Sequence, residues 1–160
     1  NGKMDLSIPV EKFRGKQCVK DVQISLHNNW QKLHWRAIKA SYNSAPFFEY
    51  YEDDFAPFYE KKYQFLLDFN MDLFRLITIL LGVETNLNLT ENYIDYHEND
   101  FREIIHPKKS SYIDKTFADY SYYQVFSQKN GFIPNLSIID LLFNMGNESR
   151  IVLKNTFIER

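Results

Sequence analysis

The sequence predicts an α+β fold that is dominated by helices, with a short N-terminal β-hairpin or sheet packed against several helices. Two patterns lead to this prediction. Apolar and polar residues alternate over residues 4–10 and 22–26, as they do along half-buried strands. Beyond residue 30, apolar residues recur every three or four positions, as on the buried face of a helix. The length of 160 residues fits a single domain that spans the whole chain.

The first residues resemble the continuation of a strand pair. Asn1-Gly2 is a dipeptide typical of hairpin turns, and neither an initiator Met nor a signal peptide precedes the first alternation. We therefore expect the domain to lack its N-terminal segment, including a strand before Asn1. Gly15 and its basic neighbours predict the turn between the two strands that follow.

The first helix is expected from Trp30 to about Tyr42. Asn28 or Asn29 suits its N-terminus, because an asparagine side chain there accepts a backbone N–H bond from the first turn. Between residues 46 and 63 we expect two short helices, since proline favours the first turn of a helix: Pro46 and Pro57.

The clearest helix extends from residue 65 to residue 81. Leu66, Phe69, Leu73 and Ile77 share one face of it, and Gly82 is suited to a left-handed stop. The remaining elements follow weaker patterns and are expected as strands over 85–89 and 122–126 and as helices over 100–105, 136–145 and 148–156.

The composition excludes several classes of protein. The formal net charge is −2, from 19 basic and 21 acidic residues without long runs, so nucleic acid is not expected as a specific target. No apolar run approaches the roughly 20 residues that cross a bilayer, so we expect no transmembrane segment. Cys18 is the only cysteine, which excludes an internal disulfide and favours a cytoplasmic location. Aromatic residues reach 17%, enough to build a core and to leave rings for a binding surface.

His34 is the best single candidate for catalysis. It lies beside the apolar face that Trp30, Leu33 and Ala37 form on the first helix, so it points partly inward. A neutral imidazole can act as a general base near neutral pH. The alternative is a hydrogen-bonded packing residue. The opposite face of the helix is basic, and it either clamps an anion or is a solvated surface: Lys32, Arg36 and Lys39.

Two later helices carry polar residues close to their apolar faces. Asn70 falls inside the apolar arc of its helix, where an unpaired amide would cost about 1–3 kcal/mol, so it needs either a backbone partner or a ligand. Ser137, Asp140 and Asn144 share a stripe of the helix predicted over 136–145. Ser137 and Asp140 have the spacing of a capping box, and Asn144 suits the helix end, but polar stripes also line clefts.

One segment gathers histidine and carboxylate side chains: Asp95, His97, Glu98, Asp100, Glu103 and His106. The last two would share a helix face, as metal ligands do. An N-cap at Asn99, acidic residues in the first turn and a histidine at the end of a short helix explain the same charges, so no metal site is predicted. The chain also lacks the motifs of common nucleotide-binding, hydrolase and zinc proteins, and no cofactor is predicted.

Three stretches, read together, resemble the WbqC-like protein family. The first is NWQKLHWRAI at residues 29–38 with ASYNSAPFF at 40–48. The second is LDFN at 67–70 with LG at 81–82, and the third and most distinctive is FIPNLSIIDLLFNMG at 132–146. Together with LSIPV at 6–10, they follow the order of the family along nearly the whole chain.

The resemblance implies a bacterial protein whose relatives are often encoded among surface-polysaccharide genes. Some relatives are described as glycine transferases that act on amino sugars, and such relatives carry an upstream segment with a strand and a basic motif. The implied function is aminoacyl (glycyl) transfer in O-antigen biosynthesis, with a nucleotide-linked amino sugar and an aminoacyl donor as partners. The competing interpretation is a non-enzymatic module that binds glycans or proteins.

Acyl transfer to an amine needs a base for the amine proton and donors for the carbonyl oxygen. On this hypothesis His34 is the base, and Asp140 orients it or binds the amino sugar. Tyr122 is a further candidate for a sugar-lining surface. The residues expected to bind substrate lie in or near the same motifs: Trp30, Arg36, Tyr42, Asn70, Tyr123, Gln124, Asn135, Ser137 and Asn144.

The two interpretations predict different shapes. An enzyme predicts that His34, Asn70 and Asp140 converge on one cleft that is open to solvent. A binding module predicts scattered polar groups whose hydrogen bonds are satisfied within the protein, together with an exposed aromatic patch.

Overall fold

A computed structural model describes residues 2–98, 100–102 and 117–157. Three long helices dominate this part of the chain: α1 (Trp30–Tyr42), α2 (Phe48–Glu60) and α3 (Leu66–Leu80). The shorter helices are α4 (Ser127–Asn130), α5 (Ile138–Met145) and α6 (Ser149–Thr156). Short 3-10 helices occupy Val19–Asp21, His27–Asn29 and Gly146–Glu148.

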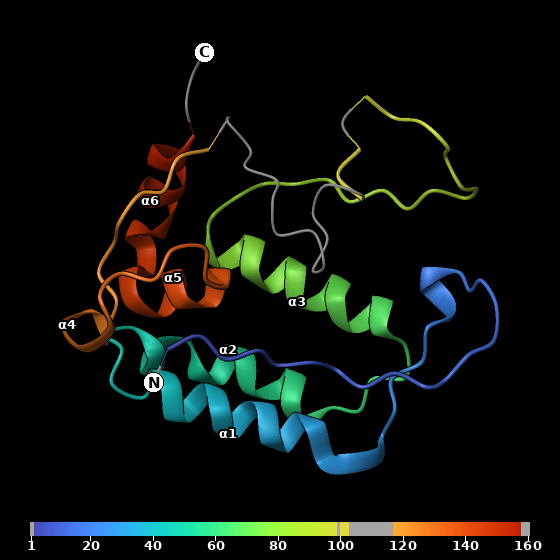
Figure 1. Cartoon of the computed structure of the whole chain (residues 1–160), viewed down its shortest axis with the longest axis horizontal. Coiled ribbons are helices and arrows are strands. Elements are labelled where there is room, and N and C mark those ends of the chain that lie inside the picture. The colour runs from blue at the N-terminus through green and yellow to red at the C-terminus, as the bar shows by residue number, and fades with distance from the viewer. Residues whose placement is uncertain (1, 99, 103–116, 158–160) are drawn as a thin grey trace.

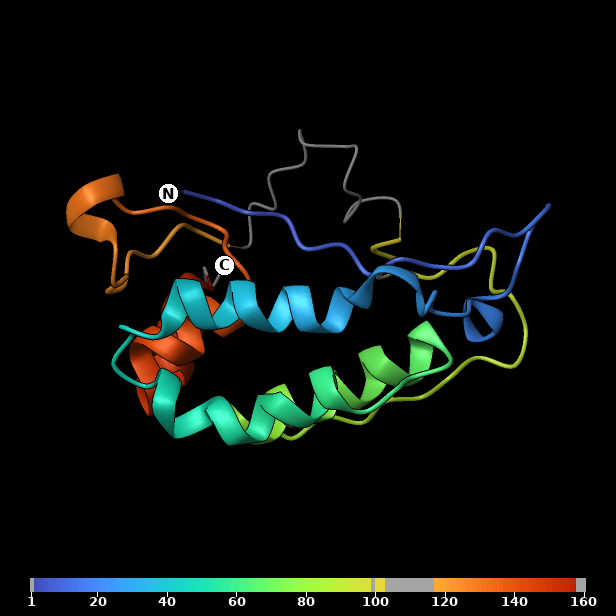
Figure 2. The same ribbon diagram turned by 90° about the horizontal axis from the view of Figure 1, so that it is seen from below.

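The long helices pack against one another, and the C-terminal helices close one end of them (Figure 1). α1 and α2 lie side by side in opposite directions, while α2 also contacts α3 and α5. α5 and α6 lie at the end of the molecule where α1 finishes and α2 begins (Figure 1). Residues 2–10 run as an extended segment along α1 (Figure 2).

The expected α+β class is wrong, because the described residues contain no β-strand and no sheet. Residues 4–10 and 22–26 meet only at one isolated antiparallel bridge, between Val10 and Ile24. Pro9 has no N–H to donate and contributes only its carbonyl, which accepts from the Ser25 N–H at 2.9 Å. The other side of residue 24 is already occupied, since its N–H donates to the carbonyl of Gln64 at 2.9 Å. Single bridges therefore replace the predicted hairpin.

The other predicted strands are absent for a related reason. Residues 85–89 lie in an irregular stretch, with Leu87 and Leu89 exposed. Residues 122–126 include no strand, and the Val125 N–H donates to the side chain of Asn144 at 2.9 Å rather than to a neighbouring strand. β-propensity yields a strand only where a partner backbone pairs with it, and neither segment forms a β-bridge within the described part of the chain.

The main helices are confirmed by the structure, although their ends differ from those expected. Gly82 has a φ of +63° and follows α3 as predicted. Asn29 has a left-handed backbone, and its side chain makes no capping hydrogen bond, so the predicted cap is wrong. The Ser137 side chain likewise makes no capping bond at α5. The helix predicted over 100–105 is not seen at residues 100–102, which are irregular, and residues 103–105 lie outside the described residues.

The two short helices predicted between residues 46 and 63 are a single helix, α2. Pro57 lies inside it rather than in a new first turn. Because Pro57 comes near the C-terminal end of α2, the N–H that it lacks would have bonded the carbonyl of Asp53, an exposed residue that water can reach. One helix therefore continues through the proline to Glu60.

Aromatic side chains build two adjoining cores, as the composition suggested. The main core lies between α1, α2 and α5, and its buried residues are Ile38, Ala45, Phe48, Tyr51, Phe55, Leu142 and Phe143. The second core lies where α1 and α3 meet the β-bridge between Val10 and Ile24. Its buried residues are Ile24, Trp30, Tyr63 and Phe69.

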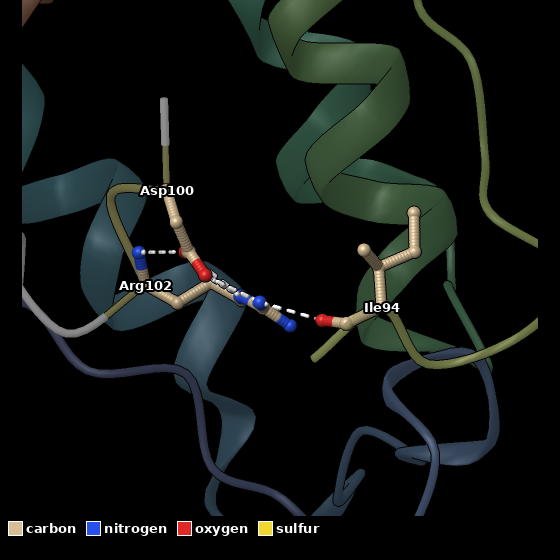
Figure 3. A network of polar contacts seen from close by, with 3 residues as sticks. All are labelled: Ile94, Asp100 and Arg102. Atoms are coloured by element: carbon tan, nitrogen blue, oxygen red, sulfur yellow. Dashed lines mark hydrogen bonds and ion pairs between the residues drawn. The ribbon is translucent and has the colours of Figure 1, made fainter. Parts of the chain in front are cut away.

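In the described part of the His/carboxylate segment, residues 95–98 and 100–102, Asp100 forms an ion pair with Arg102. The Arg102 guanidinium donates to both carboxylate oxygens of Asp100 (Figure 3). It also donates to the carbonyl of Ile94, at 2.8 Å. The hydrogen bonds from Arg102 lower the pKa of Asp100 to about 2. Among the described residues, no three His, Cys, Asp or Glu side chains gather as metal ligands would. Glu103 and His106 lie outside the described residues.

No helix in the described ranges is both long enough and apolar enough to cross a bilayer.

Candidate functional site

A cavity of about 920 Å³ lies between α1, α3, residues 2–8 and the segment from residue 124 to residue 140. This volume lies in the range of typical small-molecule sites, about 300–1,000 Å³. Seven of the eleven residues predicted for the site line it: His34, Tyr42, Asn70, Gln124, Asn135, Ser137 and Asp140. Three elements that are far apart in the sequence therefore contribute predicted site residues to one cavity.

His34 is held at the cavity wall by α1 and by the N-terminal segment. Its side chain is only 9% exposed, and its ring packs edge-on against Trp30 with the centroids 5.1 Å apart. Burial lowers the pKa of its imidazole below the ordinary value of 6.5, while a hydrogen bond to the backbone of Ser7 opposes that effect. The imidazole is therefore neutral at pH 7, which is the form that accepts a proton.

The lowered pKa of His34 makes stability depend on pH. The unfolded chain takes up a proton near pH 6.5, before the folded imidazole does, so acidification through and below that pH favours unfolding. Between about pH 7.5 and about pH 5.5, we expect the urea midpoint to fall more in the wild type than in His34→Gln. His27→Gln, at an exposed histidine, should retain the wild-type slope. An equal slope in wild type and His34→Gln would contradict this assignment.

Asp140 is the centre of a buried hydrogen-bond network on α5. Its side chain is 5% exposed, and its Oδ2 accepts from the Tyr122 hydroxyl at 2.7 Å and from the Gln124 amide at 3.2 Å. The Tyr42 hydroxyl, from the end of α1, is also hydrogen-bonded to this carboxylate. The carboxylate thus joins α1, α5 and the extended segment between them, instead of completing the predicted capping box with Ser137.

Both tyrosines that donate to Asp140 remain protonated at neutral pH. Burial raises the pKa of Tyr122 well above its ordinary value of 10, and the hydrogen bond to Asp140 raises it further. Burial, followed by the charge of Asp140, has the same effect on the pKa of Tyr42. The site therefore combines one carboxylate with two phenolic donors.

Gln124 holds the loop after α4 against this network. Its Nε2 donates to the carbonyl of Ile133 at 2.9 Å, and its Oε1 accepts from the N–H of the same residue at 2.9 Å. Because the amide is 5% exposed and bonded on both ends, its role in the structure is to position the loop and Asp140. Its predicted role as a substrate ligand stays a prediction.

Asn70 lies on the cavity side of α3 and differs from the sequence expectation. Its position on the helix predicted burial among apolar residues, with either a backbone partner or a ligand for the amide, but the residue is exposed and its amide has no hydrogen bond to a described residue. The cavity occupies the space where a packed neighbour was expected. Asn135 has a left-handed φ of 53°, which asparagine tolerates better than most residues, and it lies in the loop at the same cavity.

Four predicted site residues do not line the cavity. Trp30 is buried in the second core, and Arg36 is exposed on α1 outside the cavity. The amide of Asn144 is 3% exposed and is committed to the Val125 N–H and to the Asp140 carbonyl, 2.9 and 2.7 Å away. Tyr123 is 53% exposed and faces a different hollow. These positions reflect core packing and chain direction, which helical periodicity alone does not reveal.

Sequence reasoning missed the basic residues at the cavity. Lys3, from the N-terminal segment, and Lys129, from α4, both line it, together with the acidic residue Asp5. Neither lysine makes an ion pair within the described part of the chain. No local motif marks these lysines, because they belong to segments that come together only through the fold.

Comparison with known proteins tests the family resemblance. The model of the WbqC-like protein family matches residues 1–110 and 102–152. The uncharacterized protein Rv1507c of Mycobacterium tuberculosis (strain ATCC 25618 / H37Rv) is 31% identical over 172 residues, covering 90% of this chain and 73% of that protein. No solved structure matches the chain. Because the family match extends over nearly the whole sequence, the chain belongs to the WbqC-like protein family.

Proposed function

We propose that this protein transfers an aminoacyl group, such as glycyl, to the amine of an amino sugar. The resemblance to relatives described as glycine transferases suggests the reaction class. The observation that carries the proposal is that His34, Asn70 and Asp140, from three different helices, line one cavity of about 920 Å³. Such a cavity is large enough for an amino sugar together with part of its carrier.

The proposed aminoacyl transfer needs one general base and one leaving group. The amine nitrogen attacks the carbonyl carbon of an activated aminoacyl donor, an ester or thioester, and a C–N bond forms as the bond to the leaving group breaks. His34 takes the proton that the amine loses and returns it to the leaving group. A neutral imidazole is required for the first step, and the lowered pKa of His34 supplies that form at neutral pH.

Asp140 suits recognition of the amine. A buried carboxylate attracts an N–H group strongly because water does not compete, and charge-assisted hydrogen bonds are roughly twice as strong as neutral ones. The phenols of Tyr42 and Tyr122 hold the carboxylate in place. In this proposal Asn70, whose amide has no partner in the described chain, donates to the carbonyl oxygen as it becomes negative.

Lys3 and Lys129 support a phosphate-linked sugar as the substrate. Both line the cavity and are exposed, and the ion pairs within the described chain involve other residues. An ammonium group is a common phosphate ligand in proteins. The proposed acceptor is therefore an amino sugar joined to a nucleotide through phosphate.

A binding module remains the second candidate function, and a specific observation favours it. Among the described residues, every buried side-chain nitrogen and oxygen has a hydrogen-bond partner, as expected where polar groups serve the fold. Several tyrosines are also largely exposed, including Tyr50 at 75% and Tyr96 at 82%. A module of this kind would bind sugars without changing them.

The decisive experiment examines the polysaccharide of cells whose only copy of the protein is a variant. His34→Ala is expected to lower aminoacyl substitution of the amino sugar strongly, because a general base contributes about 100- to 10,000-fold to the rate. Asp140→Asn should lower it too, by weakening recognition of the amine. Mass spectrometry of the released glycan measures the substitution.

Matched variants separate chemistry from folding. His27→Ala and Asp68→Asn change exposed residues of the same types outside the cavity and should leave the glycan unchanged. Circular dichroism of each purified protein shows whether the fold is retained. Normal glycan substitution in folded His34→Ala and Asp140→Asn would remove the basis for the transferase and favour the binding module.

A further inference from the structure

A second hollow, of about 420 Å³, lies on another side of the segment that carries Tyr122. Residues 120–123 form one wall of it, and the 3-10 turn Gly146–Glu148 together with α6 forms the other. Figure 1 shows this segment, in orange, running beside α5 and α6. The hollow shares Tyr122 with the Asp140 network, but none of its lining residues borders the large cavity.

Apolar surface in this hollow is exposed to solvent. Tyr120 is 43% exposed, Tyr123 is 53% exposed and Ile151 is 60% exposed. Within the described chain, neither Tyr120 nor Tyr123 packs its ring against another aromatic ring. Two partly exposed rings in a concave surface offer flat apolar faces to a ligand.

Unused polar groups surround these rings. Ser121, Glu148 and Asn155 line the same hollow and are exposed, and their side chains make no hydrogen bond or ion pair with described residues. A carboxylate, an amide and a hydroxyl together supply both donors and acceptors. The arrangement matches a ligand that has an apolar face and an edge of hydroxyl groups.

From this combination we propose that the hollow is a saccharide-binding site. The C–H face of a pyranose ring packs on the Tyr123 ring, and adjacent sugar hydroxyls donate to Glu148 and exchange hydrogen bonds with Asn155. An aliphatic peptide would leave the carboxylate and the amide unused, so a sugar fits the lining better. The site takes neutral sugars and does not depend on the acyl transfer proposed for the large cavity.

Saturation-transfer NMR of the folded protein tests the site with methyl β-glucoside, N-acetylglucosamine and rhamnose. At least one of these sugars is expected to bind with a Kd of about 1–10 mM, as a small, open site would. Tyr123→Ala should weaken this binding about 3- to 10-fold, because the variant loses the ring on which the sugar face packs. Glu148→Gln should weaken it as well, by replacing the carboxylate acceptor.

Two controls define the location. Tyr50→Ala removes a tyrosine that is 75% exposed on α2 and borders neither hollow, so it should leave binding unchanged. Asn130→Ala changes an exposed residue that lines the large cavity but not this hollow, so it should also leave binding of these neutral sugars unchanged. The proposal is overturned if none of the three sugars binds, if Tyr123→Ala binds as well as wild type, or if only Asn130→Ala abolishes binding. These results are independent of whether the protein transfers an aminoacyl group.

Discussion

Replacing Phe143 with alanine is expected to lower the free energy of unfolding by about 3–5 kcal/mol, the usual cost of removing a fully buried phenylalanine. Phe143, on α5, is 0% exposed. Its ring meets those of Phe48 and Phe55 on α2, with centroids 5.1 and 5.2 Å away, and the ring of Tyr42 at 5.1 Å. The substitution would leave a cavity where α1, α2 and α5 join, and these rings would lose their shared neighbour.

Urea denaturation followed by tryptophan fluorescence measures this loss. Phe74→Ala is the matched control, because Phe74 on α3 is 41% exposed and its removal should cost less than about 1 kcal/mol. Similar losses for both variants would show that the α2–α5 junction does not dominate the core. Since Tyr42 also bonds Asp140, we expect Phe143→Ala to disturb the cavity wall even where the protein remains folded.

Gly146→Ala is expected to cost about 2–4 kcal/mol, from backbone strain together with a steric clash. Gly146 joins α5 to the following 3-10 turn with φ 54° and ψ −130°, a conformation that residues with a Cβ rarely adopt. A Cβ there would lie 2.6 Å from Cδ1 and 2.8 Å from Cγ of Phe47. The backbone of Phe47 is held in place, because its N–H donates to the Phe143 carbonyl at 2.9 Å, so only movement of the Phe47 ring could relieve the contact.

Gly131→Ala separates the two contributions. Gly131 also has a positive φ, +69°, but an added Cβ would meet no atom within 4 Å. We therefore expect it to show the strain alone, about 1–2 kcal/mol, and to be more stable than Gly146→Ala in urea. Equal losses for the two variants would mean that the contact with Phe47 contributes nothing.

The helices could be predicted because the residues that form each helix, and the spacing of its apolar face, lie within one segment of the sequence. In α3, Leu66, Phe69, Leu73 and Ile77 recur at helical spacing, and the helix was found with its glycine stop. The two C-terminal helices, α5 and α6, were also expected, one on either side of Gly146. Helical hydrogen bonds close within one segment, so local sequence contains most of the information.

The strands failed because their hydrogen bonds depend on a distant backbone. Residues 4–10 alternate as a strand does, yet Pro9 and the position of Gln64 leave only one bridge to residue 24. The same limit applies to the site. His34 and Asp140 were named from their motifs, whereas the lysines of the cavity and the clamp made by Gln124 on Ile133 require segments that fold together.

The sequence alone determined the family, through the resemblance of its motifs, and this was confirmed by the family match. It also determined the main helices and the aromatic source of the core, because these follow from spacing within single segments and from composition. Tertiary structure decided that the N-terminal segment lines a cavity instead of building a sheet. It also decided that Asn70 lines that cavity and that the side chain of Asn144 makes hydrogen bonds within the fold. The physical reason is the same in each case: the outcome depends on which segments far apart in the sequence come to lie together, and that depends on how the helices pack.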